Sequence, residues 1–215
     1  MKSILLHGLG QGSSSWESVV RVMDNRSDIL CPDLSELLNS TEPCYSNLYK
    51  ALNNYCSQFD EPLNLCGLSL GGILALNYAT EHSKKVNALV LIGTQASMPK
   101  RLLKFQNMIF RLMPSSAFRS MGFNKKSVIN LSKSMLDLDL RQDLKQVSCP
   151  TLVIYGERDR ANKAASLELN DLLQHAELMV IPNSGHEINI DAPVELGKCL
   201  NIFFNSKNKT QDLSL

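Results

Sequence analysis

The segment Leu65–Gly72, LCGLSLGG, decides how the rest of this chain is interpreted. It places Ser69 between Gly67 and Gly71, and it joins an apolar run to the long apolar stretch LGGILALNYAT. A reactive serine on a sharp strand-to-helix turn needs very small neighbours, because strand and helix approach closely there. The alternative is a tight glycine turn with an idle serine, and the surrounding sequence has to separate the two.

Apolar runs lie on both sides of this turn along the chain and alternate with helix-length segments. The runs are nearly continuous, as in strands that are buried on both faces of a parallel sheet. The predicted strands are Ser3–His7, Asp28–Cys31, Leu63–Cys66, Ala88–Ile92, Thr151–Tyr155 and Leu178–Ile181. The predicted helices are Ser14–Asp24, Ser46–Phe59, Leu70–His82, Asn162–Gln174 and Val194–Phe204. This alternation indicates a three-layer αβα fold with right-handed crossovers.

One long interval, between Ile92 and Thr151, has no strand signal. Its apolar positions recur at helical spacing, so it is predicted to be a helical insertion. We therefore expect an α/β core at residues 1–96 and 147–206, a helical cap at 97–146 and a frayed polar tail at 207–215.

The composition limits the class of protein and the cell compartment in which it is expected to work. A length of 215 residues with 44% hydrophobic content suits one globular domain, and a net charge of +1 argues against bulk attraction to nucleic acid or membrane. No transmembrane helix and no signal peptide is expected, since the longest apolar runs are strand-sized. The scattered cysteines match no zinc motif and favour reduced thiols in a cytoplasmic protein.

A serine nucleophile needs a base, and four histidines are available. His186 lies in IPNSGHEIN, directly after the last predicted strand, where catalytic groups gather in open α/β sheets. It is the candidate general base for Ser69. We interpret His82 and His175 as helix-terminal residues and His7 as a structural hydrogen-bonding residue.

The base needs an acid that fixes its tautomer, and the segment LVIYGERDR offers two carboxylates after a predicted strand. Asp159 is the candidate, and Glu157 is the rival. Either carboxylate could instead pair with a neighbouring arginine at the surface. The oxyanion of the reaction would need backbone N–H donors, which Leu70 of the turn and Leu9 of the loop HGLGQG can supply.

The ordered motifs resemble the α/β-hydrolase superfamily, in the branch of small capped hydrolases with carboxylesterases, enol-lactonases and haloperoxidase-like enzymes. The matching stretches are ILLHGLGQGSSSWE, LCPDL, LNLCGLSLGGILAL, VNALVLIGT, DLRQDLKQVSCPTLVIYGERD and IPNSGHEINIDAPVEL. The order Ser…Asp…His is that of this superfamily. The resemblance implies Ser69 as nucleophile, His186 as base, Asp159 as acid, and the N–H groups of Leu9 and Leu70 as oxyanion donors. It implies no metal or organic cofactor.

The chain departs from the family pattern in two respects. It begins on the His-Gly strand, which the family usually places after two or more others, so we expect a reduced sheet of six parallel strands in the order 2-1-3-4-5-6. The insertion is also shorter than the usual four-helix cap, and the cap lines the substrate pocket in this family.

The insertion has an unusual composition between residues 98 and 126. It has no acidic residue and these basic ones: Lys100, Arg101, Lys104, Arg111, Arg119, Lys125 and Lys126. Its large apolar residues include Met98, Phe105, Met108, Phe110, Met113, Phe118, Met121 and Phe123. They predict an apolar acyl pocket near Ser69. The charges form either a rim for an anionic carrier or lipid headgroup or, as we prefer, a solvated face.

The sequence thus favours a serine hydrolase that cleaves a small-molecule ester or thioester, as a monomer or homodimer. Acyl transfer or carbon–carbon bond hydrolysis would use the same residues. A non-catalytic hydrolase-like binding protein is the alternative from another class, although such proteins often lack a triad member.

Overall fold

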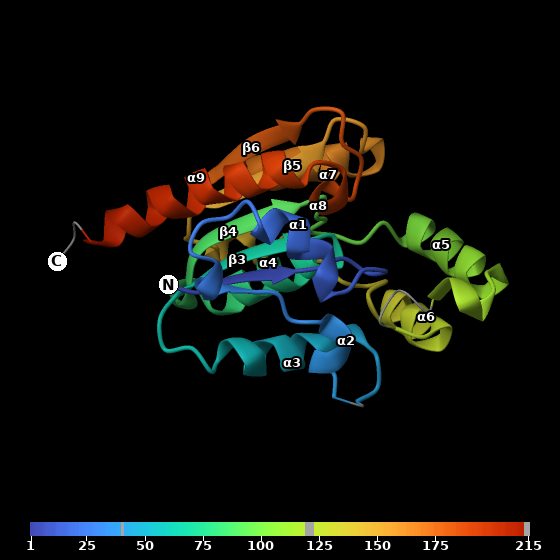
Figure 1. The fold of residues 1–215 in the computed structure, drawn as a ribbon. Helices are drawn as coiled ribbons and strands as arrows, with labels where there is room; N and C mark the ends of the chain where they lie inside the picture. Colours follow the sequence, from blue (N-terminus) through green and yellow to red (C-terminus); the bar gives the residue numbers. More distant parts are fainter. Residues whose placement is uncertain (40, 119–122, 213–215) are drawn as a thin grey trace.

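The computed structural model describes residues 1–39, 41–118 and 123–212, and within them a six-stranded sheet has the order β2-β1-β3-β4-β5-β6 (Figure 1). All neighbouring strands are parallel. The strands are β1 (Ser3–Leu6), β2 (Ile29–Leu30), β3 (Leu63–Leu68), β4 (Val86–Ile92), β5 (Thr151–Gly156) and β6 (Ala176–Ile181). The predicted fold class and strand order are confirmed.

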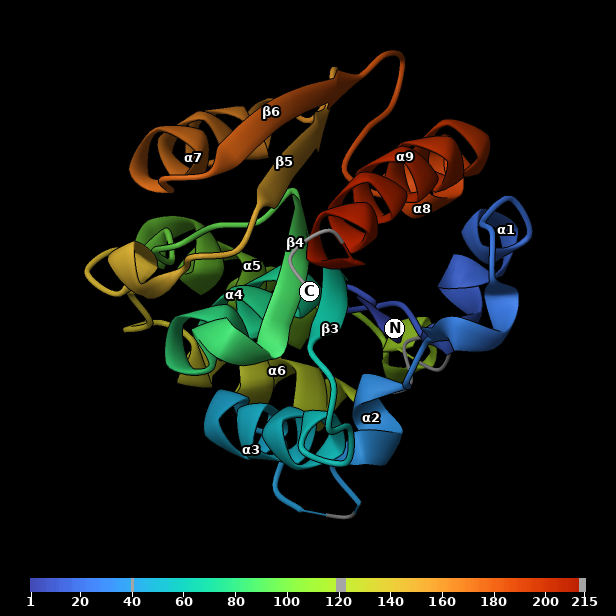
Figure 2. The ribbon, with the colours of Figure 1, turned by 90° about the vertical axis from the view of Figure 1, so that its left-hand side faces the viewer.

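Helices cover both faces of this sheet, as Figure 2 shows. One face is covered by α1 (Glu17–Val20), α8 (Ile188–Asp191) and α9 (Pro193–Asp212). The other face is covered by α2 (Leu34–Leu37), α3 (Tyr45–Cys56), α4 (Leu70–Glu81) and α7 (Arg160–Leu172). Side chains of β1 alternate between the two, because Leu5 packs in the first layer and Ile4 and Leu6 pack in the second.

Strand β6 differs from the prediction that it is buried on both faces. Met179 and Val180 are 37% and 41% exposed, whereas β3 and β4 are buried along their whole length. The reason is position, since β6 lies at the edge of the sheet and pairs only with β5. An apolar run alone does not distinguish an edge strand from a central one.

Several helix boundaries also differ from the sequence prediction. The first predicted helix is a 3₁₀ turn at Ser13–Trp16 followed by the short α1, and α2 and α8 were not predicted. Helix α9 continues past Phe204 to Asp212, so it ends later than predicted and extends into the segment predicted as a polar tail. Within the added turns, Lys207 Nζ lies 3.7 Å from a Glu177 oxygen and 5.3 Å from the ring centroid of Phe203. Residues 213–215 lie outside the described residues.

The insertion lies between β4 and β5 and contains α5 (Lys100–Leu112) and α6 (Lys125–Ser134). Figure 1 places both helices beyond the carboxyl ends of the strands. The two ends of the insertion meet in an antiparallel bridge between Ser97 and Asp139, so the prediction of an all-helical insertion was wrong there. Of the residues singled out in its sequence, Arg119 and Met121 lie outside the described residues, as do the side chains of Arg101, Lys104 and Phe105.

Short 3₁₀ turns complete the secondary structure, at Arg26–Asp28, Ser83–Lys85, Ser115–Phe118 and Leu144–Gln146. In the part of the chain that the structure describes, no helix has both the length and the apolar character needed to cross a membrane. All six cysteines are free thiols.

Candidate active site

Ser69 stands at the turn between β3 and α4 with a strained backbone. Its φ is 52° and its ψ is −112°, a conformation that a residue with a side chain rarely adopts. The Ser69 N–H donates to the carbonyl oxygen of Ile92, at 2.9 Å, which ties the turn to the end of β4. Backbone strain of this kind persists only where the surrounding structure holds it, and it is concentrated at functional sites.

The glycines around Ser69 are required by close packing of the backbone. A Cβ atom on Gly67 would lie 2.3 Å from the Gly71 backbone, and one on Gly71 would lie 2.2 Å from the carbonyl oxygen of Leu6. A Cβ on Gly72 would lie 1.9 Å from Thr94 Oγ1. All three contacts are far shorter than carbon and oxygen atoms tolerate. The glycines therefore allow α4 to start directly against β1 and β3 with Ser69 at the turn.

His186 and Asp159 are brought together from two loops at the carboxyl edge of the sheet. Asp159 follows β5 and caps α7, His186 follows β6, and His186 Nδ1 donates to Asp159 Oδ2 at 2.8 Å. The Asp159 side chain is only 5% exposed, whereas that of His186 is 38% exposed. Burial raises the pKa of the Asp159 carboxyl, but hydrogen bonds from His186 and Asn162 outweigh it and hold the pKa below its usual value. The pair thus consists of an ionised buried acid and an accessible imidazole.

Asn162 is a site residue that sequence reasoning missed. Its side-chain nitrogen lies 2.9 Å from each carboxylate oxygen of Asp159, and its backbone N–H donates to Oδ1 at 3.2 Å. The same nitrogen lies 3.1 Å from His186 Nδ1. Gln95 Nε2 in turn donates to Asn162 Oδ1 at 2.8 Å. These contacts fix the orientation of the carboxylate, and the signal in the sequence was only a polar residue three positions after Asp159.

The rival carboxylate, Glu157, has a different partner. Its Oε2 accepts a hydrogen bond from the backbone N–H of Asn183, at 2.8 Å, and its side chain is exposed. Of the two carboxylates in LVIYGERDR, it is Asp159 that contacts His186.

Gly93 was also missed, although it directly follows the buried strand β4. It has a φ of +53°, and a Cβ there would lie 2.8 Å from the imidazole of His186 and 3.4 Å from Asp159 Oδ2. A side chain at this position would displace the His186 ring, so the glycine leaves room for the pair. A glycine at the carboxyl end of a predicted central strand is the signal that could have found it.

The loop after β1 contains Leu9, and its shape depends on two neighbours. Gly10 has a φ of 96°, which favours glycine. Gln11 links this loop to the one after His186, because its Nε2 donates to Glu187 Oε1 at 2.9 Å and its Oε1 accepts from Asn189 Nδ2 at 3.1 Å. Gln11 and Asn189 were not predicted, since this contact joins segments that lie far apart in the sequence.

His7 has the structural role that the sequence suggested. Its Nδ1 donates to the Gly8 carbonyl oxygen at 2.9 Å, and its Nε2 accepts from the Leu34 N–H at 3.0 Å. Burial lowers the pKa of the imidazole, against the opposing effects of Gly8 and Asp33. His7 is thus a neutral residue with both nitrogens engaged, and it is not available as an acid or base.

A cavity of about 440 Å³ connects these elements. Ser69 and His186 line it together with Leu9 and Leu70, and Leu70 is the first residue of α4, where backbone N–H groups have no partner within the helix. Its remaining walls are mostly apolar and come from the core and the insertion: Ile73, Gly93, Gln95, Met98, Pro99, Leu103, Ile109, Ser132, Met135, Ala161 and Asn162. A larger cavity of about 780 Å³ lies within the insertion, but none of the candidate catalytic residues lines it.

The methionines and phenylalanines of the insertion were expected to be buried near Ser69, and only some of them are. Met98 lines the Ser69 cavity, whereas Phe118 and Phe123 line the larger cavity and Met108 is 53% exposed. Within the described residues no group of three or more histidine, cysteine, aspartate or glutamate side chains could hold a metal ion.

The strained serine and the paired histidine and aspartate are thus brought to one cavity at the carboxyl edge of an α/β sheet. The model of the alpha/beta hydrolase family matches residues 4–197. The chain therefore belongs to the alpha/beta hydrolase family, which confirms the resemblance found in its sequence.

Individual relatives are distant in sequence. The chain is 24% identical to a pimeloyl-[acyl-carrier protein] methyl ester esterase of Nitrosomonas europaea, over 91% of this chain and 92% of the relative. Its structure matches an enol-lactonase from Burkholderia xenovorans with a TM-score of 0.78 at 19% identity, covering 95% and 91% of the two chains. It matches a structure from a study of carboxylesterases of Nitrososphaera gargenis with a TM-score of 0.80 at 16% identity, covering 97% and 92%.

Proposed function

We propose that this protein is a serine hydrolase that cleaves a carboxylic ester or thioester through an acyl-enzyme on Ser69. The observation that carries the proposal is that Ser69 and the Asp159-bound His186 line one apolar cavity. A strained serine beside an oriented imidazole is the arrangement that nucleophilic acyl transfer requires. The family relatives include esterases, and this supports an enzyme of the carboxylic ester hydrolase class.

The geometry supports a specific division of roles. Asp159 occupies Nδ1 of His186, which leaves Nε2 to accept the proton of Ser69 Oγ while that oxygen attacks the substrate carbonyl. The backbone N–H groups of Leu9 and Leu70 would stabilise the oxyanion, since both residues line the cavity. His186 then protonates the leaving group. In the deacylation step His186 activates a water molecule, which hydrolyses the acyl-enzyme and releases the carboxylic acid.

The cavity also supports a substrate with an apolar acyl group. Its walls include Ile73, Met98, Leu103 and Met135, and methionine adapts to irregular acyl shapes. The relative from Nitrosomonas europaea is named as an esterase for a methyl ester, which agrees with this class. We further propose that residues 97–146 act as the cap over a core of residues 1–96 and 147–206, and that the enzyme is cytoplasmic and a monomer or homodimer.

Steady-state hydrolysis of p-nitrophenyl esters of increasing acyl length, and of the matching acyl thioesters, tests the proposal. We expect kcat/KM to rise with acyl length and then fall when the chain exceeds the cavity. Ser69→Ala should lose at least ~10⁴-fold in kcat on every substrate. Hydrolysis by Ser69→Ala at the wild-type rate would refute the assignment, and a flat length profile would refute the acyl pocket. Transfer to an added alcohol at the expense of hydrolysis would indicate an acyltransferase.

A further inference from the structure

Three large apolar side chains stand exposed on helix α5. Met108, Ile109 and Leu112 are 53%, 41% and 81% exposed, and Leu112 is the most exposed large apolar side chain of the described residues. Positions 108 and 112 are one helical turn apart and 109 adjoins them, so the three share one face. The residues on the opposite side, Leu103 and Asn107, are half-buried and buried. We call Met108, Ile109 and Leu112 the outer face of α5.

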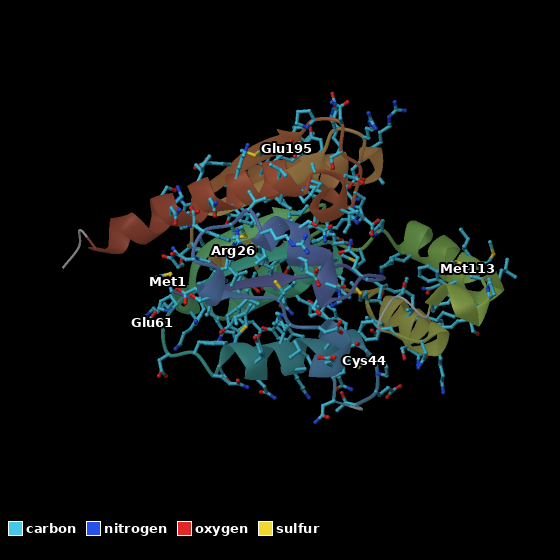
Figure 3. The ribbon with its side chains drawn as sticks, in the orientation of Figure 1. Met1, Arg26, Cys44, Glu61, Met113 and Glu195 are labelled. Carbon is cyan, nitrogen blue, oxygen red and sulfur yellow. The ribbon has the colours of Figure 1, made fainter. Side chains whose placement is uncertain are left out.

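Helix α5, which carries the outer face, lies at an extreme of the molecule (Figure 1). In Figure 1, α5 extends beyond the carboxyl ends of the strands, on the side away from both chain termini. Figure 3 shows Met113, which directly follows α5, at the far end of this projection. A broad, flat partner can therefore approach this helix without meeting the core of the protein.

Positive charge lies at the C-terminal end of the outer face. Residues 98–126 contain no acidic residue, and Arg111 and Lys126 are exposed. Lys125 Nζ donates to the backbone carbonyls of Arg111 and Met113, at 2.7 and 2.6 Å, which fixes a cation at the C-terminal end of α5. Lys126 and Lys133, together with Lys125, line the cavity of about 780 Å³ in the insertion. An exposed apolar face with a basic border is the pattern of a helix that lies in the surface of an anionic membrane.

The outer face also adjoins the candidate active site. Ile109 is part of this face, and it lines the same cavity as Ser69. Leu103 of the same helix lines that cavity as well. Ile109 thus borders both the cavity and the exposed side of α5.

We propose that the outer face of α5 docks the protein on the surface of an anionic lipid membrane. The apolar side chains enter the boundary between headgroups and acyl chains, and the arginine and lysines contact the lipid phosphates. Docking in this orientation presents the Ser69 cavity to amphiphilic esters in that membrane, a consequence that rests on the proposed function. The binding is peripheral and reversible, since three side chains and a few charges anchor far more weakly than a spanning helix.

Flotation of the full-length protein with lipid vesicles tests this proposal. We expect wild type to bind vesicles of phosphatidylcholine with about one third phosphatidylglycerol, and to bind less at high salt and to pure phosphatidylcholine. Met108→Glu/Leu112→Glu should weaken binding at least ~10-fold, because two carboxylates replace the inserted side chains. Ile202→Glu is the matched control, since Ile202 is 73% exposed on α9. This control should bind within ~2-fold of wild type.

Two further measurements distinguish a loss of membrane docking from a loss of catalysis or of folding. Ser69→Ala should bind vesicles as wild type does, so a failed esterase assignment leaves the docking result intact. Met108→Glu/Leu112→Glu should hydrolyse soluble p-nitrophenyl butyrate at the wild-type rate, since neither side chain lines the Ser69 cavity. The same variant should lose hydrolysis of a long-chain ester embedded in vesicles.

Several outcomes overturn the proposal. The proposal is wrong if the wild-type protein does not bind vesicles, or if Met108→Glu/Leu112→Glu binds them as strongly as wild type. A wild-type dimer that this variant converts to a monomer in light scattering would assign the outer face to self-association. Binding to an acidic acyl-carrier protein with no binding to vesicles would assign it to a protein partner.

Discussion

The carboxyl edge of the sheet and the insertion above it differ in how tightly their surroundings fix each residue. At the edge, an added methyl on Gly71 would lie 2.2 Å from a carbonyl oxygen, and Asp159 is held by His186 and Asn162. In the insertion, Leu112 is 81% exposed on α5. Catalytic groups need positions that are fixed within fractions of an ångström, whereas a surface that binds a partner has to be exposed to solvent. Under the proposed function, the chemistry takes place at the carboxyl edge of the sheet and the insertion determines which substrate is bound.

The sharpest test of the fixed edge compares its two carboxylates. Asp159→Asn should lower kcat for ester hydrolysis by ~10³- to 10⁴-fold, because the imidazole of His186 loses the acceptor that fixes its tautomer. Glu157→Gln should stay within ~3-fold of wild type, since Glu157 contacts Asn183 instead. Kinetics with p-nitrophenyl butyrate measures both. Equal losses in the two variants would contradict the assignment.

A pair of glycine substitutions tests whether packing holds the turn at Ser69. Gly71→Ala should destabilise the protein by ~3 kcal/mol or more, because its methyl would meet the backbone of Leu6. Gly8→Ala is the control, since its nearest contact would be an ordinary 3.6 Å from Leu68, and we expect a loss below ~1 kcal/mol. Urea unfolding gives both values. Wild-type stability in Gly71→Ala would show that the turn is looser than described.

The role of Asn162 can be separated from that of the pair it supports. Asn162→Ala should lower kcat by ~10- to 100-fold, as expected for loss of hydrogen bonds to a charged group, and it should change KM less. Asn54→Ala, at an exposed position of α3, is the control. A change in KM alone would assign Asn162 to substrate binding and not to positioning of Asp159.

The smallest effect is expected at the capping residue of α6 in the insertion. Asn124 accepts a hydrogen bond from the Ser127 N–H at 2.9 Å, so Asn124→Ala should cost ~1 kcal/mol of stability. Hydrolysis of a soluble ester should change less than ~2-fold, because Asn124 does not line the Ser69 cavity. Thermal unfolding and kinetics on the same samples check this. A large loss of activity would show that α6 is coupled to the catalytic groups.

The strand order and the main candidate residues could be predicted because they depend on local signals. Buried parallel strands give continuous apolar runs, and right-handed crossovers restrict their order. Ser69, Asp159 and His186 each follow such a run directly, and the carboxyl ends of parallel strands meet at one edge.

Other features depend on contacts between distant segments, and the sequence did not reveal them. Asn162 matters because it reaches Asp159 and His186 at once, and Gly93 matters because the His186 ring lies against it. Helical spacing predicted that α5 is amphipathic, but not that Met108 faces outward, because that depends on how the helix packs on the core. The exposure of β6 follows likewise from its place at the sheet edge.

We propose that Ser69 is the activated nucleophile of this chain, and covalent labelling by a fluorophosphonate probe tests that role. Intact mass after reaction with the probe, followed by peptide mapping, locates the covalent adduct. We predict one adduct per chain, on Ser69, no adduct on Ser69→Ala, and slower labelling of Asp159→Asn. An unlabelled wild type, or equal labelling of Ser69→Ala, would contradict the account.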